Sequence, residues 1–367
     1  MGKVISAGHI CLDITPVFQS GRTFGKISEL LIPGKLIQME GASVHTGGSV
    51  ANTGLALKLL GNDVTLLGKV GDDEFGSMVQ SILAGYGADG LIVDGNSSTS
   101  YSVVLAVPGT DRIFLHNPGA NDTFTSDDIP EEALQDAVLF HFGYPTLMKK
   151  MYEDGGSGLV KLFERVKDHD IATSLDLTAV DADSPAGKED WSVILSNVLP
   201  FTDFFEPSFE EICFMLDRPL YEKRAASGGD MTEQDGITSD ADRLAVRCLE
   251  MGCGAVLIKC GLSGMVYRTG GSVRLSETGS RMALDIRKWA DKAGVQPCLR
   301  AENVLSATGA GDVSIAAWLT ALMRGEAPDV CTRLAAAEGA ASVTAYDALS
   351  GILSIEELKK RIAAGWN

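Results

Sequence analysis

The feature that most constrains the fold is an alternation of short, continuously apolar runs with longer runs of helical character. The apolar runs have the length and composition of buried strands and lie at 4–10, 64–70, 138–142, 171–177 and 255–259. The helix-like runs lie between them, at 49–60, 75–84, 158–168, 209–216 and 240–251. Apolar strands separated by helices are typical of a parallel sheet covered on both faces. Because crossovers between parallel strands are right-handed, the pattern predicts a layered α/β fold around a central, mostly parallel sheet.

Two zones interrupt this alternation with short β-type stretches, at about 15–45 and 99–117. Such stretches can form a small sheet that projects from the main domain, which predicts a lid over a substrate. The alternative is an ordinary edge hairpin. With 367 residues, of which 45% are hydrophobic, the chain is long enough for one large domain or two smaller ones.

The charge balance excludes some classes of partner. Acidic residues outnumber basic residues by 49 to 31, and the formal net charge is −18. Nucleic acid is therefore not expected as a partner, because its phosphate backbone needs a basic face. No secretory signal and no apolar run of about 18 residues is present, so no membrane is expected either. The seven cysteines are scattered and odd in number, which predicts buried reduced thiols and a cytoplasmic location.

A glycine loop that ends in a carboxylate is the strongest chemical signal. The run 306–312 reads Ser-Ala-Thr-Gly-Ala-Gly-Asp and precedes a helix-like segment at 313–324. Backbone N–H groups at a helix N-terminus attract anions, and glycines let a ligand approach the backbone. Asp312 stands where it could take a proton from an attacking hydroxyl, so the run predicts phosphoryl transfer. The alternative is a plain loop with an N-cap aspartate. The chain contains no P-loop sequence.

A second glycine element opens the helix-like run at 49–60. Gly47 and Gly48 precede this run, and Asn52 within it offers both donors and an acceptor of hydrogen bonds. Paired glycines before a helix allow the close approach of a small ligand. On its own, the element is equally typical of an ordinary turn and cap.

The two glycine elements, in this order, resemble the two signature regions of the ribokinase family of carbohydrate kinases, also called the PfkB family. The run 68–76, Gly-Lys-Val-Gly-Asp-Asp-Glu-Phe-Gly, resembles the remainder of the first region, and 308–312 resembles the second. The resemblance covers nearly the whole chain. It implies one kinase domain, residues 1–367, with the ribokinase-like layered fold and a small lid. It also implies phosphoryl transfer from ATP to a hydroxyl of a small sugar.

The resemblance assigns roles to individual positions. Asp312 corresponds to the general base. The anion hole, which stabilises charge on the transferred phosphoryl group, corresponds to Gly309, Ala310 and Gly311. The positions that correspond to substrate contacts are Asp13, Gly47, Gly48, Asn52 and Asn121.

The nucleotide side is implied in the same way. The corresponding ATP-binding positions are Ser208, Lys259, Gly261, Ser263, Gly264 and Gly311. Glu211 corresponds to an acidic residue that is linked indirectly to magnesium. The implied cofactors are therefore ATP and Mg²⁺.

Three features depart from the family pattern. Ser306 and Ala307 replace the usual Asp-Thr, whose aspartate helps to hold a monovalent cation, so a requirement for K⁺ stays open. Ser208 replaces an asparagine and cannot donate an amide hydrogen bond. The segment 270–300 is longer than in most relatives and lies where the nucleotide base is expected. We hypothesise that Trp289 or its neighbours cover the nucleotide; the alternative is a surface excursion.

The sequence thus predicts a phosphotransferase whose partner is a small-molecule sugar. The nearest alternative is a nucleoside kinase of the same family, because the glycine element at 47–54 is compatible with nucleoside-binding members. A non-catalytic sugar-binding sensor is a further alternative, since a fold alone does not establish an activity. A dinucleotide-dependent dehydrogenase is disfavoured, because no Gly-x-Gly-x-x-Gly follows the first strand. An exposed lid would also allow two copies to pair as a homodimer.

Overall fold

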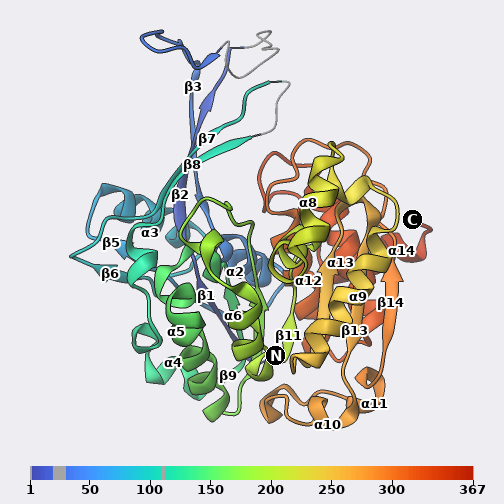
Figure 1. Cartoon of the computed structure of the whole chain (residues 1–367). Coiled ribbons are helices and arrows are strands. Elements are labelled where there is room, and N and C mark those ends of the chain that lie inside the picture. The colour runs from blue at the N-terminus through green and yellow to red at the C-terminus, as the bar shows by residue number, and fades with distance from the viewer. Residues whose placement is uncertain (1, 20–29, 109–111, 367) are drawn as a thin grey trace.

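A central sheet of 8 strands, in the order β14-β13-β12-β11-β10-β9-β1-β4, divides the protein into two layers of helices (Figure 1). The computed structural model describes residues 2–19, 30–108 and 112–366. Neighbouring strands from β4 to β12 run parallel, whereas β13 is antiparallel to both of its neighbours. The predicted α/β class and mostly parallel sheet are therefore confirmed. The strands are β1 (Lys3–Gly8), β4 (Val64–Leu67), β9 (Ala137–Gly143), β10 (Ala172–Asp176), β11 (Phe204–Phe205), β12 (Ala255–Lys259), β13 (Met265–Thr269) and β14 (Ala293–Gln296).

Both faces of the sheet are buried, because successive strand side chains point to opposite sides. Phe204 packs in one core together with α2, α12, α13 and α14, whereas its neighbour Phe205 packs in the other core with α5, α6, α7 and α9. The helices of the first layer are α2 (Ser49–Leu59), α12 (Ala310–Met323), α13 (Pro328–Ser342) and α14 (Ile355–Ala363). The helices of the second layer are α5 (Lys149–Asp168), α6 (Trp191–Val198), α7 (Phe209–Leu216) and α9 (Ile237–Glu250). The remaining helices are α3 (Glu74–Gly85), α4 (Glu131–Gln135), α8 (Arg218–Ala226), α10 (Ser272–Leu275) and α11 (Ile286–Trp289).

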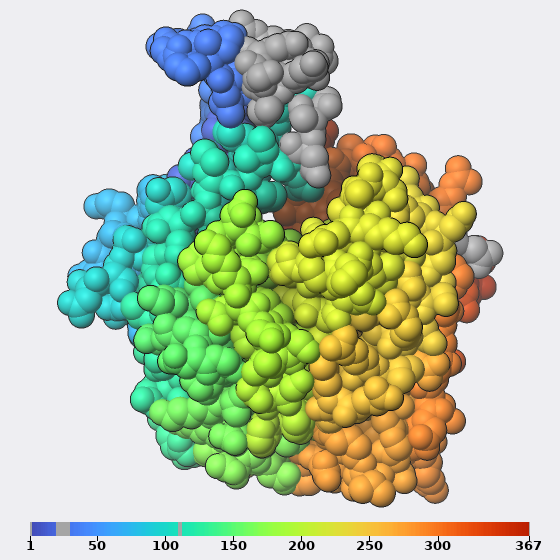
Figure 2. Space-filling view, viewed as in Figure 1, coloured from blue at the N-terminus to red at the C-terminus, as the bar shows by residue number. Residues whose placement is uncertain are grey.

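A second sheet, with the strand order β3-β2-β7-β8, stands out from the main body. We call it the lid; its strands are β2 (Cys11–Val17), β3 (Gly41–Gly47), β7 (Tyr101–Leu105) and β8 (Ile113–Asn117). The surface is hollowed between the base of the lid and the C-terminal half of the chain (Figure 2). Parts of the two zones expected to form a lid, residues 20–29 and 109–111, lie outside the described residues. A small pair of strands, β5 (Lys69–Gly71) and β6 (Ile92–Asp94), lies beside the main sheet.

In the segment 270–300, Trp289 does not lie where the hypothesis of a nucleotide cover placed it. Trp289 is only 1% exposed, and its ring packs against Phe204 and Trp318 at centroid distances of 5.9 and 5.5 Å. Its carbonyl accepts a hydrogen bond from Thr269, which pairs with the first residue of β12. Trp289 therefore lies in the core at the amino end of β12, opposite the end that carries Lys259. For Trp289 the hypothesis was wrong, because α11 places this residue in the core and β14, which follows, adds an edge strand to the sheet. That its neighbours cover the nucleotide stays a prediction.

The cysteines and the helices bear on two further expectations. All seven cysteines are free thiols; six are buried, as predicted, but Cys298 is exposed. Among the described residues, none of the helices combines the length and the apolar character needed to cross a membrane.

Candidate functional site

The candidate site lies where the carboxyl ends of parallel strands meet the starts of two helices. Ligands of open α/β sheets bind at this edge. Gly309 caps α12 with a φ of 73° and Gly48 caps α2 with a φ of 88°, both in the left-handed region that glycine tolerates. The two helices also pack against each other, and the amide of Asn62, just after α2, donates to Thr320 Oγ1 at 2.8 Å. The two glycine elements of the sequence therefore open neighbouring helices at one place.

Asp312 lies at the centre of this site and is only 4% exposed. Asn52 Nδ2 donates to Asp312 Oδ2 at 3.1 Å, and Thr53 Oγ1 donates to Asp312 Oδ1 at 3.0 Å. The Tyr144 hydroxyl lies 2.7 Å from Oδ1 and 2.8 Å from Oδ2. The structure thus brings together Asp312 and Asn52, as expected from the two glycine elements, and adds Thr53 and Tyr144.

The pKa of Asp312 depends on its burial and on the hydrogen-bond donors and charges around it. Burial raises the pKa of Asp312 above its ordinary value, and the donors Tyr144, Asn52 and Thr53 together with the Lys259 ammonium oppose this rise. A buried carboxylate needs such donors to remain ionised. Asp312 is therefore a carboxylate in a low-dielectric site whose pKa is moved toward the range that suits proton transfer.

Tyr144 was not predicted from the sequence. It follows β9 directly, and its backbone is left-handed at φ 65° and ψ 44°. Its position at the carboxyl end of an apolar strand was the only available signal, because a single tyrosine carries no motif. Burial, followed by the negative charge of Asp312, raises the pKa of Tyr144 well above its ordinary value, so its hydroxyl stays protonated.

Lys259 and Asp176 form a buried ion pair at the ends of β12 and β10. The Lys259 ammonium lies 2.7 Å from Asp176 Oδ1. Burial opposes the charge on Lys259, but Asp176 and Glu211 outweigh it and raise the pKa of the lysine. A Cβ placed on Gly311 would lie 3.8 Å from Lys259 Nζ, so the ammonium borders the expected anion hole. An ammonium beside helix N–H groups favours a phosphate.

Ser208 and Glu211 form a capping box at the start of α7. Ser208 Oγ accepts from the Glu211 N–H at 3.2 Å, and Glu211 Oε2 accepts from the Ser208 N–H at 2.7 Å. Within the described part of the chain, no group of three or more His, Cys, Asp or Glu side chains is arranged to hold a metal ion. A single carboxylate is still enough for Mg²⁺, because this ion commonly binds through one or two carboxylates together with the phosphates of a substrate. Glu211 is the matching carboxylate, because its charge reaches Asp176 and Lys259.

The loop 261–264, which the sequence predicts to bind ATP, connects β12 to β13. Ser263 Oγ donates to the carbonyl of Thr232 at 2.6 Å, so this hydroxyl holds the loop in place. The side chain of Leu262 is 65% exposed. The tip of this loop is therefore exposed, whereas the side chain of Lys259, which comes just before the loop, is largely buried.

Two of the residues that the sequence predicts to contact the acceptor lie at the base of the lid. Asp13 lies on β2, where burial raises its pKa while Cys11, Ser102 and His45 oppose the rise. A Cβ on Gly47 would lie 2.1 Å from Asp13 Oδ2, so only glycine at position 47 leaves room for this carboxylate. Asp13 and Gly47 are therefore placed together, as the resemblance implied.

Asn121 is placed differently from the expectation. Its side chain is fully buried; Nδ2 donates to the Ile10 carbonyl at 2.9 Å, and Oδ1 accepts from the Ile10 N–H at 3.2 Å. Nδ2 also donates to the Pro118 carbonyl at 3.1 Å. The amide therefore fixes the backbone between β1 and β2 instead of contacting an acceptor.

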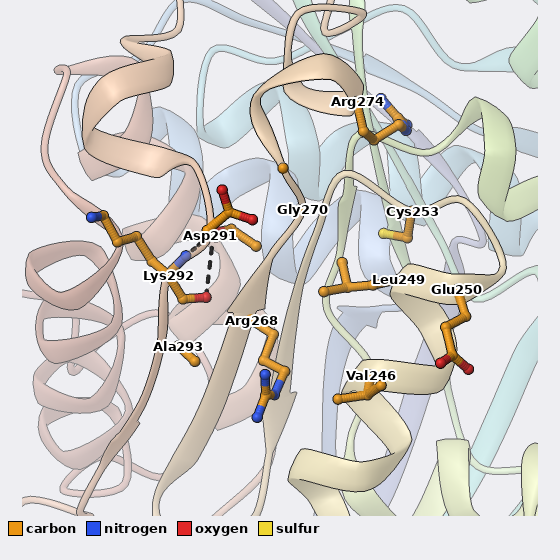
Figure 3. Close-up of a pocket in the computed structure, with 12 residues that line it drawn as sticks. Val246, Leu249, Glu250, Cys253, Arg268, Gly270, Arg274, Asp291, Lys292 and Ala293 are labelled. Carbon is orange, nitrogen blue, oxygen red and sulfur yellow. Dashed lines mark hydrogen bonds between the residues drawn. The ribbon is translucent and has the colours of Figure 1, made fainter.

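A separate cavity of about 440 Å³ lies between α9 and β13 (Figure 3). Its arginines are already paired: Arg268 with Asp242 at 2.6 Å and Arg274 with Asp203 at 3.1 Å. The cavity includes Cys253, which precedes β12, so it lies at the opposite end of the sheet from Lys259. It is not part of the candidate site.

Curated relatives match part of this chain in sequence. Among curated relatives, Fructokinase-1 of Zea mays is 29% identical over 197 residues, which are 53% of this chain and 56% of that protein. Fructokinase of Solanum tuberosum is 31% identical over 151 residues, which are 40% of this chain and 43% of that protein. The chain thus spans about half the length of these two curated relatives.

Solved structures share the fold over almost their whole length. Arabidopsis thaliana ribokinase, complexed with ribose and ATP, has a TM-score of 0.69 at 19% identity, and 98% of both chains is covered. Fructokinase with bound ATP from Xylella fastidiosa has a TM-score of 0.69 at 18% identity, covering 99% of this chain and 98% of that one. The family described as pfkB family carbohydrate kinase matches residues 10–354. Because this match covers most of the sequence, the chain belongs to the pfkB family of carbohydrate kinases.

Proposed function

We propose that this protein is an ATP-dependent kinase that phosphorylates a hydroxyl of a small sugar, with Asp312 as the general base. The observation that carries the proposal is the buried Asp312 carboxylate at the start of α12, held by Asn52, Thr53 and Tyr144 beside the Lys259 ammonium. Family membership and the fructokinase relatives support it.

The reaction follows from these positions. Asp312 accepts the proton of the acceptor hydroxyl while the hydroxyl oxygen forms a bond to the γ-phosphorus of ATP, and the bond from that phosphorus to ADP breaks. The N–H groups of Gly309 and Gly311 donate to the phosphoryl oxygens, and the Lys259 charge offsets their negative charge. The N–H of Ala310 joins them by leaving the Ala307 carbonyl, to which it donates at 3.3 Å. Mg²⁺, when bound with the nucleotide near Glu211, would neutralise further phosphate charge.

Two buried histidines support a hydroxyl-bearing acceptor. Both ring nitrogens of His9 and Nε2 of His116 are buried without a hydrogen-bond partner. The His9 ring lies 5.1 Å from that of His116 and 6.2 Å from that of Tyr144, so the pair lies near the residue that holds Asp312. Burial lowers the pKa of both histidines, which keeps them neutral. A neutral imidazole offers one donor and one acceptor, which matches a hydroxyl.

Replacing His9 by phenylalanine should raise the KM for the acceptor about 10-fold, because hydrogen bonds to the acceptor are lost. The KM for ATP should not change. Folding should be unaffected or improved, because a ring with unpaired nitrogens is replaced by an apolar ring. Steady-state kinetics with each substrate varied in turn measures both constants. The matched control is His169→Phe, since His169 follows α5 and contacts Glu131 on the surface. An unchanged acceptor KM in His9→Phe would remove His9 from the acceptor site.

The proposed function is tested by measuring ATP consumption over a panel of acceptors: ribose and fructose against adenosine, inosine and cytidine. Turnover with a sugar supports the proposal, whereas turnover only with nucleosides assigns the chain to the nucleoside alternative. Sugar binding without turnover would indicate the sensor. The panel is run in K⁺ and in Na⁺, because Ser306 replaces the aspartate that helps to hold a monovalent cation in the family. The Ser306 hydroxyl instead accepts a hydrogen bond from the Thr308 N–H.

The lid also offers a surface through which we expect two copies to pair. On its edge strand β8, Phe114 and Leu115 are 54% and 55% exposed. Exposed apolar side chains on an edge strand favour association of this kind. Light scattering should give the mass of two chains for the native protein and of one chain for Phe114→Lys. Val193→Lys on α6, where Val193 is 47% exposed, is the control and should stay paired. A native protein with the mass of one chain would refute the pairing.

A further inference from the structure

Tyr144 holds the proposed base in a way that no sequence motif requires. Its hydroxyl is within hydrogen-bonding distance of both oxygens of Asp312, at 2.7 and 2.8 Å. The hydroxyl is the donor, because a carboxylate only accepts. Neither Asn52 nor Thr53 reaches both oxygens. Tyr144 is therefore the one described side chain that bridges the carboxylate.

The backbone of Tyr144 is strained in a way that serves this contact. Its φ of 65° is uncommon for an aromatic residue, and such strain concentrates at functional sites. The Tyr144 N–H donates to the Asp176 carbonyl at 3.2 Å, which ties the residue to the end of β10. The chain therefore turns sharply after β9, and the phenol points at Asp312.

We propose that Tyr144 is a positioning residue that keeps Asp312 ionised and oriented until the acceptor arrives, then releases one carboxylate oxygen to the acceptor hydroxyl. The proposal rests on the proposed function, in which Asp312 is the base. An acceptor hydroxyl must donate to Asp312 before it can lose its proton, and in the free protein both oxygens already accept from Tyr144. A phenol that bridges two oxygens can give up one contact and keep the other, so the carboxylate stays oriented throughout.

The charges around Asp312 make the role of Tyr144 testable by pH. Lys259 on β12 favours the ionised form of Asp312. Asp176 on β10 faces the same region, since the charge of Asp312 contributes to the raised pKa of Asp176. The negative charge of Glu211 on α7 acts on both Tyr144 and Lys259. Burial raises the pKa of Asp312, and the hydrogen bond from Tyr144 lowers it. Removing the phenol hydroxyl should therefore raise the pKa of Asp312.

The experiment measures kcat/KM for the acceptor against pH in the native protein and in Tyr144→Phe. The acidic limb of the profile should move to higher pH in the variant. The loss should be about 10-fold at low pH and should shrink as pH rises, in line with a lost hydrogen bond to a charged group. A merely structural role would lower the rate by the same factor at every pH. That parallel profile would overturn the proposal.

Two comparisons keep the result interpretable. Tyr152→Phe makes the same change at a buried tyrosine on α5, and its profile should coincide with that of the native protein. Carboxyl NMR of ¹³C-labelled aspartate, with the Asp312 signal assigned by its loss in Asp312→Asn, follows the titration of Asp312 without any turnover. An unmoved Asp312 titration in Tyr144→Phe refutes the inference alone. Full turnover by Asp312→Asn refutes the proposed function itself.

Discussion

Replacing Asp312 by asparagine should lower kcat by about 10²–10⁴-fold, the contribution expected from a general base. Asparagine has nearly the same shape but cannot take the proton of the acceptor hydroxyl. The KM for ATP should change little, because the N–H groups at the start of α12 and the Lys259 ammonium are left in place. The measurement is a coupled assay of ADP formation with the best acceptor of the panel.

The control for Asp312→Asn is the same change at Asp190. Asp190 caps α6 by accepting from the Val193 N–H at 3.2 Å, so it also lies at a helix start but not in the site. Asparagine is a good N-cap, and Asp190→Asn should keep full activity. Native turnover in Asp312→Asn, with correct folding shown by thermal unfolding, would contradict the role of Asp312 as the base.

Replacing Lys259 by methionine should lower both turnover and stability. Removing one charge from an anion hole costs about 10²–10³-fold in kcat. Breaking a buried ion pair from one side destabilises a protein by about 3–5 kcal/mol, because the remaining charge is left unpaired. Burial raises the pKa of Asp176, and Lys259 opposes this rise. Without the lysine, the carboxyl can instead take up a proton and reduce this cost.

The stability of Lys259→Met should therefore depend on pH. Because Asp176 has a higher pKa in the folded than in the unfolded protein, its neutral form adds stability at low pH, and this stability is lost as pH rises through the folded-state pKa. Without Lys259 that pKa is higher still. Chemical denaturation should show a destabilisation that grows as pH rises from about 4, the ordinary pKa of an aspartate, toward the raised pKa of the folded protein.

A double variant separates the two effects of Lys259. Lys259→Met with Asp176→Asn removes both charges, so much of the stability should return while turnover stays low. Recovery of turnover in the double variant would show that Lys259 acts only by neutralising Asp176. A Lys259→Met protein with native kcat would remove the lysine from the phosphoryl site.

The two glycine elements could be recognised in the sequence, because each forms a local pattern before a helix-like run. The structure places both elements at neighbouring helix starts, whereas the roles of Gly47, Gly48 and Asp312 were implied by the family resemblance and stay predictions. Thr53 and Tyr144 could not be found in this way. Thr53 contacts Asp312 because of how α2 is rotated, and Tyr144 contacts it because of the direction in which the chain leaves β9. Both orientations are fixed only by long-range packing.

The fold was predictable where the local pattern was strong. The strand at 255–259 and the helix at 209–216 have the bounds that the apolar runs predicted. The two-residue strand β11 was missed, because Phe204 and Phe205 are too short a run to form a pattern. The role of Trp289 was misjudged because an antiparallel edge strand, β14, carries no distinctive signal before its neighbour is known.

The hydrogen bond between Asn52 and Asp312 joins residues that are 260 positions apart. During synthesis, the first glycine element and the lid strands leave the ribosome long before α12 exists. A nascent chain therefore lacks Asp312, the base of the proposed reaction, however well its early segments have folded. Because one side of the site comes from each end of the chain, the proposed transfer of phosphate from ATP needs both ends to have been synthesised.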